Sequence, residues 1–206
     1  MFKDRKDAGK QLARKLAVYA GKSTVVLALP RGGVVTGYEI SRALKAPFDI
    51  IAVRKVGHPS NPEYAVGAVD ENGASLFNKE EAATIDAKLL RQETAKELTE
   101  ARRRSVVYRG GRASLDLVGK IVLLVDDGIA TGLTMRLAVR SVKAQEPEKV
   151  IVAAPVAPLE AIQYLKKEGA DDVITLEPPE AFNGAVGAHY EQFEQVEDAE
   201  VVRLLR

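Results

Sequence analysis

Two adjacent carboxylates and a loop of glycine and threonine are the residues of this 206-residue chain best suited to chemistry. Asp126 and Asp127 follow a run of apolar residues, and Thr131, Gly132 and Thr134 come shortly after them. Carboxylates accept hydrogen bonds from vicinal hydroxyls and bind Mg²⁺, directly or through water. A Thr-Gly turn that opens a helix offers backbone N–H groups, hydroxyls and the positive end of the helix dipole to a phosphate. The pattern therefore indicates a site for a phosphorylated polyol such as ribose 5-phosphate.

Two other phosphate-binding motifs do not fit this loop. A Walker A loop requires Gly-x4-Gly-Lys-Ser/Thr, but Gly128 and Gly132 are one residue too close, and Leu133 stands where the lysine should be. The Gly-x-Gly-x-x-Gly pattern of dinucleotide sites is absent as well. A purely structural role, capping a strand and starting a helix, explains each residue alone but not the whole run.

A second turn of similar chemistry lies near the N-terminus. The apolar run 24–29 leads through Pro30, Arg31, Gly32 and Gly33 into a helical pattern. The guanidinium fork of an arginine matches phosphate oxygens, so this turn suits a second anion, although a tight turn with an incidental surface arginine is the simpler alternative. Another basic pair, Arg54 and Lys55, follows a predicted strand over 49–53 and would suit the same anion; alone, such a pair is more often solvated surface charge.

The remaining pattern predicts the elements that would position these residues. Apolar runs predict strands over 24–29, 49–53, 121–125, 150–154 and 172–176. Helical spacing predicts a helix over 4–20, packed at the sheet edge and without functional residues, and an apolar stripe through Leu133, Leu137, Val139 and Val142. Because strands and helices alternate, we expect a parallel, doubly wound sheet.

The segment 57–115 departs from this alternation. Its pattern predicts an irregular loop over 57–64 and a hairpin that pairs 65–69 with 74–77 around Asn72-Gly73. One long charged helix is predicted over 79–107, with an i,i+4 pair between Glu100 and Arg104. His58 lies in the predicted loop, and we do not assign it a catalytic role.

The apolar strand, the two acids and the Thr-Gly-x-Thr run resemble the phosphoribosyl-diphosphate (PRPP) motif of type I phosphoribosyltransferases. The likeness is greatest to poorly characterised bacterial and archaeal phosphoribosyltransferase-like proteins. It implies an α/β fold, an open parallel sheet with helices on both faces, with a hairpin and flexible loop and a small C-terminal hood. It also implies ribose and metal contacts at Asp126 and Asp127, a 5′-phosphate loop at Ala130, Thr131, Gly132, Leu133 and Thr134, and a pyrophosphate site at Arg31, Gly32, Gly33, Arg54 and Lys55. Some family members have a non-proline cis peptide in the glycine turn.

The resemblance covers most of the chain, so we expect one phosphoribosyltransferase-like domain over 1–206, with 57–115 as an insertion and 178–206 as the hood. Phe182 or Tyr190 of the hood could stack on a base or belong to a satellite core. The charged helix, 79–112, could contribute to a homodimer.

Composition limits the other classes. Hydrophobic residues make up 46% and charged residues 29%, and the net charge of +1 provides no global basic field for nucleic acid or membrane. The chain has no cysteine, hence no disulfide framework and no thiolate nucleophile. We see no signal peptide and no stretch that could span a bilayer, and we expect a cytoplasmic protein.

The resemblance implies a Mg²⁺-dependent transferase (a glycosyltransferase) of nucleotide and nucleoside metabolism, whose substrates are PRPP and a small nitrogenous acceptor. Hypoxanthine and guanine enzymes carry an acid where Ala130 stands and commonly a lysine where Leu133 stands, which disfavours a 6-oxopurine. Adenine, orotate, uracil and non-base acceptors stay open. The alternative is a non-catalytic regulator that senses PRPP and binds nucleic acid through Arg102, Arg103, Arg104 and Arg109. We do not favour nucleic acid as a partner. Hydrolysis of a sugar phosphate lacks an obvious water-activating residue.

Overall fold

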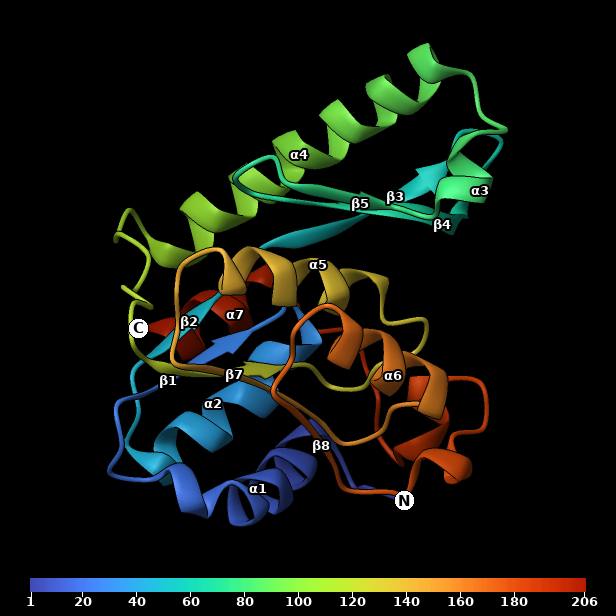
Figure 1. The fold of residues 1–206 in the computed structure, drawn as a ribbon. Coiled ribbons are helices and arrows are strands. Elements are labelled where there is room, and N and C mark those ends of the chain that lie inside the picture. Colours follow the sequence, from blue (N-terminus) through green and yellow to red (C-terminus); the bar gives the residue numbers. More distant parts are fainter.

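A five-stranded parallel sheet forms the centre of the molecule (Figure 1). The structure, a computed structural model, describes the backbone of residues 1–206 and every side chain except that of Glu63. The strands stand in the order β2-β1-β6-β7-β8, with each neighbouring pair parallel. They are β1 (Thr24–Ala28), β2 (Phe48–Ile50), β6 (Ile121–Val125), β7 (Lys149–Ala154) and β8 (Asp172–Thr175). The apolar strand before the acid pair, β6, is therefore the middle strand.

Helices cover both faces of this sheet. On one face lie α1 (Arg5–Lys15) and α2 (Gly32–Leu44), and on the other lie α5 (Leu133–Lys143) and α6 (Leu159–Lys167). Successive residues of a strand point to opposite faces, so Val26 packs with α1 and α2 whereas Leu27 packs with α5 and α6. The predicted fold class, an open parallel sheet between two layers of helices, is confirmed.

The prediction that the N-terminal helix α1 packs at the sheet edge was wrong. Asp4 caps this helix by accepting a hydrogen bond from the N–H of Asp7 at 2.8 Å. Its apolar stripe includes Leu12, which is fully buried and belongs to the same core cluster as Val26 of β1 and Leu123 of β6. The helix thus packs over the central strands, and a short 3-10 turn, η1 (Ala17–Tyr19), follows it.

A smaller antiparallel sheet lies beside the parallel one. It contains β3 (Val53–His58), β4 (Asn61–Asp70) and β5 (Ser75–Phe77), and the long helix α4 (Ala87–Arg109) crosses it (Figure 1). The predicted hairpin is present as the β4–β5 pair. The predicted single helix is instead two, α3 (Lys79–Ala82) and α4, because Asp86 caps a new helix by accepting from the N–H groups of Lys88 and Leu89.

Two further expectations in this region were wrong. The strand predicted over 49–53 ends at Ile50, and the chain passes to the second sheet, so that Arg54 and Lys55 lie within β3. The predicted irregular loop over 57–64 is largely strand, with register shifts around Gly57. A Cβ at Gly57 would lie 2.4 Å from the Pro62 carbonyl oxygen, so glycine is needed where the two strands approach.

The C-terminal tail folds back on the N-terminus. After β8 come η2 (Pro179–Ala181), η3 (Val186–His189) and α7 (Asp198–Leu205). Phe2 and Tyr190 form a parallel bridge, in which the Phe2 N–H donates to the His189 carbonyl at 2.8 Å. Both ends of the chain are thereby held beside the sheet.

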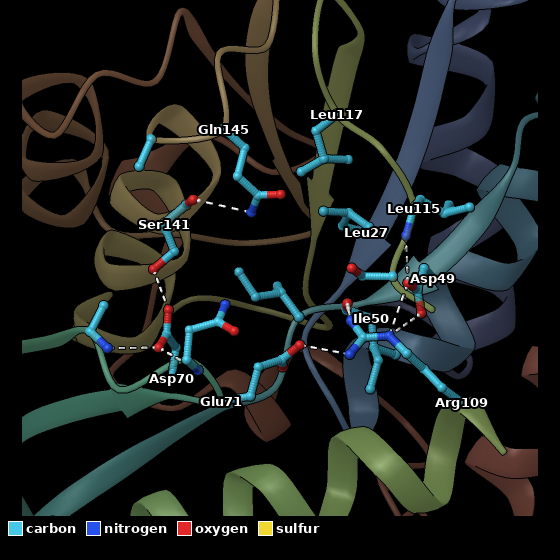
Figure 2. A pocket seen from close by; sticks show the side chains of 15 residues that line it. Leu27, Asp49, Ile50, Asp70, Glu71, Arg109, Leu115, Leu117, Ser141 and Gln145 are labelled. Carbon is cyan, nitrogen blue, oxygen red and sulfur yellow. Dashed lines mark hydrogen bonds and ion pairs between the residues drawn. The ribbon is translucent and has the colours of Figure 1, made fainter. Parts of the chain in front are cut away.

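Arg109, the last residue of α4, ties the two sheets together (Figure 2). Its Nε donates to both Asp49 carboxylate oxygens at 3.0 Å, and its Nη1 donates to Glu71 Oε1 at 2.7 Å. Asp49 belongs to β2 and Glu71 to the hairpin turn, and all three side chains are at most 11% exposed. These residues line a cavity of about 400 Å³ between the hairpin turn and the end of α5. Its carboxylates are satisfied by these contacts, so we interpret the network as structural.

We expect Arg109→Ala to lower the free energy of unfolding by about 3–5 kcal/mol, because it leaves two buried carboxylates without their cation. Urea denaturation measures this change. Arg203→Ala is the matched control, since Arg203 is 65% exposed and pairs only with Glu200 of the same helix; it should cost under about 1 kcal/mol. Equal effects would show that the network does not hold the sheets together.

Candidate active site

The acid pair lies at the carboxyl end of the middle strand, where open α/β sheets bind ligands. Asp126 and Asp127 follow β6 directly and are both partly buried. The Asp126 carboxylate accepts a hydrogen bond from the Asp127 N–H at 2.9 Å. The neighbouring strand β1 ends beside them and delivers the glycine turn to the same edge, because the two strands are parallel and in register from Thr24 and Ile121 onwards.

The glycine turn touches the acid pair. A Cβ at Gly32 would lie 1.9 Å from Asp127 Oδ2, and one at Gly33 would lie 2.9 Å from the Asp126 Cα. Any larger residue would displace the acids, which explains the two glycines physically. The peptide bond between Pro30 and Arg31 is cis, as it is in some members of the family that the sequence resembles.

The loop between the acids and α5 presents unpaired donors. Gly132, with φ of +76°, precedes the first residue of α5. Neither the backbone N–H groups of 130–134 nor the hydroxyls of Thr131 and Thr134 donate to any other described group. Such orphan donors at a helix start are a ready site for an anion.

Two cavities meet at the acid pair, and both are lined by Asp126, Asp127, Lys55 and Thr134. The first, the basic cleft, has a volume of about 370 Å³ and is also lined by Arg31, Gly32, Arg54, Lys96 and Arg104. The second, the loop pocket, has a volume of about 230 Å³ and is also lined by Ala130, Thr131, Gly132, Val186 and Phe193. The acids thus separate a cationic space from a space of backbone donors.

Arginines in the basic cleft are held by carboxylates. Arg54 Nε donates to Glu97 of α4 at 2.8 Å, and Arg31 Nη1 lies 3.6 Å from Asp198 of α7. An anion entering the cleft would compete for these cations with carboxylates that come from distant parts of the chain. Lys96 and Arg104 of α4 also line the cleft.

Arg5 also reaches the site, although α1 was expected to carry no functional residue. Arg5 Nε donates to Asp127 Oδ2 at 2.6 Å across 122 residues of chain. The guanidinium lies 3.8 Å from the ring centroid of Phe193, which itself lines the loop pocket. Nothing in the local pattern around Arg5 or Phe193 could have revealed this contact, because it depends on where both ends of the chain return.

Burial and the charge of Asp127 raise the pKa of Asp126 well above the usual range of an aspartate. The backbone N–H of Asp127 and the distant Lys55 ammonium oppose this rise without cancelling it. The acid pair is therefore a place where a cation or a set of hydroxyl donors would be stabilising. Burial also raises the pKa of Tyr190, whose neutral phenol donates to the Asp127 carbonyl at 2.5 Å.

Other predicted residues have mainly structural surroundings. Gly33 and the side chain of Leu133 are buried and do not line either cavity. Tyr190 is 6% exposed, and Phe182 stacks on His189 with ring centroids 5.6 Å apart, so the satellite-core alternative describes both. His58 accepts a hydrogen bond from the Ser60 N–H near the β3–β4 turn.

The four arginines of the nucleic-acid alternative differ in exposure: Arg102 and Arg103 are exposed, Arg104 is partly buried and Arg109 is buried. Arg109 is buried in the network of Figure 2, and Arg103 and Arg104 both pair with Glu100 at 2.7 Å, which confirms the predicted i,i+4 pair. Hydrogen bonds from these arginines lower the pKa of Glu100 to about 2. The helix α4 nevertheless carries seven basic and three acidic residues, so these ion pairs leave it with an excess of positive charge.

Among the described side chains, no three His, Cys, Asp or Glu residues gather as a metal-binding group. Asp126 and Asp127 are the carboxylates that line both cavities, and a cation would relieve their mutual repulsion. Mg²⁺ is commonly held by one or two carboxylates together with substrate phosphates, so this donor set fits it. None of the described helices combines the length and apolar composition needed to cross a membrane.

The chain belongs to the phosphoribosyl transferase domain family, whose model matches residues 2–192. Two Mycobacterium tuberculosis proteins, from strains CDC 1551 and H37Rv and provisionally named phosphoribosyl transferases, are 42% identical over the whole chain. The chain spans 46% of the length of each of these relatives.

Solved structures show the same architecture. The TT1426 protein of Thermus thermophilus is 42% identical and has a TM-score of 0.81, with 100% of this chain and 97% of that chain covered. The AQ2163 protein of Aquifex aeolicus, at 15% identity and a TM-score of 0.51, covers 83% of this chain and 72% of its own; this likeness concerns the fold alone.

We expect Asp126→Asn to raise the free energy of unfolding at pH 8 when divalent cations are absent. Because its pKa is raised in the folded chain, ionising Asp126 destabilises the fold, and the loss grows as the pH rises from the usual aspartate pKa to the raised one. Each pKa unit of the rise corresponds to about 1.4 kcal/mol. Urea unfolding as a function of pH should show an advantage of the variant that shrinks toward about pH 4, near the usual aspartate pKa.

The matched control is the neighbouring change Asp127→Asn. This variant should be less stable than the parent at pH 8, because it removes the partner of the largely buried Arg5. If both variants shifted stability in the same direction, the assignment of repulsion to Asp126 and attraction to Asp127 would be wrong.

Proposed function

We propose that the chain transfers ribose 5-phosphate from PRPP to a nitrogenous acceptor other than a 6-oxopurine, with release of pyrophosphate. One observation carries this proposal: the acid pair lies between two cavities that each suit an anion. PRPP has the same order of groups, a diphosphate and a 5-phosphate on either side of ribose hydroxyls. The phosphoribosyl transferase family to which the chain belongs supports this proposal.

Each residue then has a role in binding. Arg31, Gly32, Arg54 and Lys55 would hold the diphosphate in the basic cleft, while Gly33 would let the turn approach Asp126. The amides of 130–134 with the hydroxyls of Thr131 and Thr134 would hold the 5-phosphate. Asp126 and Asp127 would accept hydrogen bonds from the ribose hydroxyls and hold Mg²⁺, directly or through water. When bound, Mg²⁺ would neutralise negative charge that develops on the diphosphate.

The bond changes are simple. A nitrogen lone pair of the acceptor forms a bond to C1 of the ribose while the bond between C1 and the diphosphate oxygen breaks and its electron pair leaves with the diphosphate. The proton of the acceptor nitrogen passes to the released diphosphate or to water. PRPP brings its own leaving group, so the chain contributes position and charge stabilisation. Water would compete with the acceptor for C1 and must therefore be excluded. Residues of the small sheet and of α4 line the basic cleft and could exclude water from it.

The acceptor is restricted by one position of the loop. Ala130 is exposed and has no group that could exchange a proton with a 6-oxopurine. We therefore propose adenine, uracil, orotate or a non-base amine as the acceptor class, in a nucleotide-related pathway of the cytoplasm. A panel of these acceptors with PRPP and Mg²⁺, scored for pyrophosphate and for the new nucleotide, tests the proposal; hypoxanthine and guanine serve as the comparison.

We expect Asp126→Asn and Asp127→Asn each to lower kcat/KM by about 10²–10³, as the loss of a transition-state contact does. Pyrophosphate release under saturating acceptor measures the effect. Glu160→Gln, an exposed acid of α6, removes the same charge and should leave the rate unchanged. If the acids acted only as bulk charge, neutralising them would improve capture of anionic PRPP, so a faster variant would refute the proposed contacts.

A further inference from the structure

Arg5 reaches the acid pair from the far end of the chain. Its Nε donates to Asp127 Oδ2 at 2.6 Å, and the two side chains are only 11% and 15% exposed. An ion pair so little exposed to water is stronger than a surface pair, and a lost partner would leave a charge with little solvation. The contact lies at the edge of both cavities, since Asp127 lines each of them.

The guanidinium of Arg5 is fixed on its other sides too. Its Nη1 donates to the Glu194 carbonyl at 2.7 Å, and its plane lies over the Phe193 ring. A Cβ at Gly32 would approach Arg5 Nε to 2.9 Å as well as Asp127, so the glycine turn leaves room for this ion pair. Arg5 is therefore built into the site rather than drawn to it as a loose surface side chain.

Charge decides what this contact does. Asp126 and Asp127 alone would carry two negative charges, which would attract a divalent cation and repel a sugar diphosphate. With Arg5 included, the three side chains together carry one net negative charge. The remaining charge can still accept hydroxyl donors and share a cation that phosphate oxygens also hold.

We propose that Arg5 is a positioning residue that neutralises Asp127, so that the free site binds a divalent cation only weakly by itself and receives it mainly together with the sugar diphosphate. The first half concerns the free protein alone. The second half rests on the proposed function. Arg5 acts through Asp127 and needs no contact with the substrate.

The first test measures Mn²⁺ binding to the free protein in the absence of PRPP. The electron paramagnetic resonance signal of unbound Mn²⁺ reports how much Mn²⁺ the protein has bound. Arg5→Gln should bind Mn²⁺ about tenfold more tightly than the parent, because the acid pair regains its second charge. Arg5→Lys should stay near the parent. Lys6→Gln is the matched control: it removes the same charge from the next residue, which is exposed, and should have little effect.

A second variant protects the test if Arg5→Gln does not fold. Asp127→Asn leaves one acid beside an unpaired Arg5, so its Mn²⁺ affinity should fall below that of the parent. In the double variant Arg5→Gln/Asp127→Asn, the loss of Arg5 can act only through Asp126. Arg5→Gln should therefore tighten Mn²⁺ binding less in the Asp127→Asn background than in the parent. An Arg5→Gln affinity equal to that of Lys6→Gln, or an unchanged affinity in Asp127→Asn, would overturn the charge-balancing role.

PRPP binding measured by calorimetry in the presence of Mg²⁺ tests the second half. Arg5→Gln should weaken PRPP about tenfold while it tightens Mn²⁺, and a merely structural role would weaken both. If the parent protein bound no PRPP, the proposed function would fail while the Mn²⁺ comparison still judged Arg5. If PRPP bound the parent and Arg5→Gln equally well, the inference would fail and the proposed function would stand.

Discussion

Two carboxylates on consecutive residues repel each other, and the surroundings of Asp126 and Asp127 are arranged around that repulsion. Burial of Asp126 raises its pKa first by removing water from the carboxylate, and the charge of Asp127 raises it further. Arg5 compensates the charge of Asp127, and the Tyr190 hydroxyl donates a hydrogen bond to the backbone carbonyl of Asp127. The pair is thus held in place in the folded chain, yet it still has an unsatisfied preference for positive charge or hydroxyl donors.

The parallel sheet supplies the rest of the site by geometry alone. Since β1 and β6 are neighbours in register, their carboxyl ends deliver the glycine turn and the acid pair to one edge. Each strand leads through a turn into a helix, and at the start of α5 the backbone N–H groups have no partner among the described groups. Gly32 and Gly33 permit the close approach of the two turns, and a side chain at either would push the acids out of position.

The sequence revealed the parts of the site that are local in the chain. The β6 strand, the acid pair and the start of α5 lie within 14 residues, from Ile121 to Thr134, so their order alone predicts their arrangement. Contacts between distant segments left no such pattern. Arg5 is separated from Asp127 by 122 residues. The sequence around Arg109 suggested a surface cation, but its carboxylate partners, Asp49 and Glu71, lie in β2 and a hairpin turn far from it in the chain. The predicted boundary of the long helix was wrong because one capping residue, Asp86, determines where α4 begins.

The two ends of the chain belong to the candidate site as much as the sheet does. Phe2 and Tyr190 pair, Arg5 packs on Phe193, and a Cβ at Gly128 would lie 2.3 Å from a Val186 methyl group. The tail therefore packs directly against the loop that follows the acid pair. Val186 and Phe193 are the apolar side chains that the tail contributes to the loop pocket, beside Thr131 and Gly132. The shape of this pocket therefore depends on segments that lie far from the acid pair in the sequence.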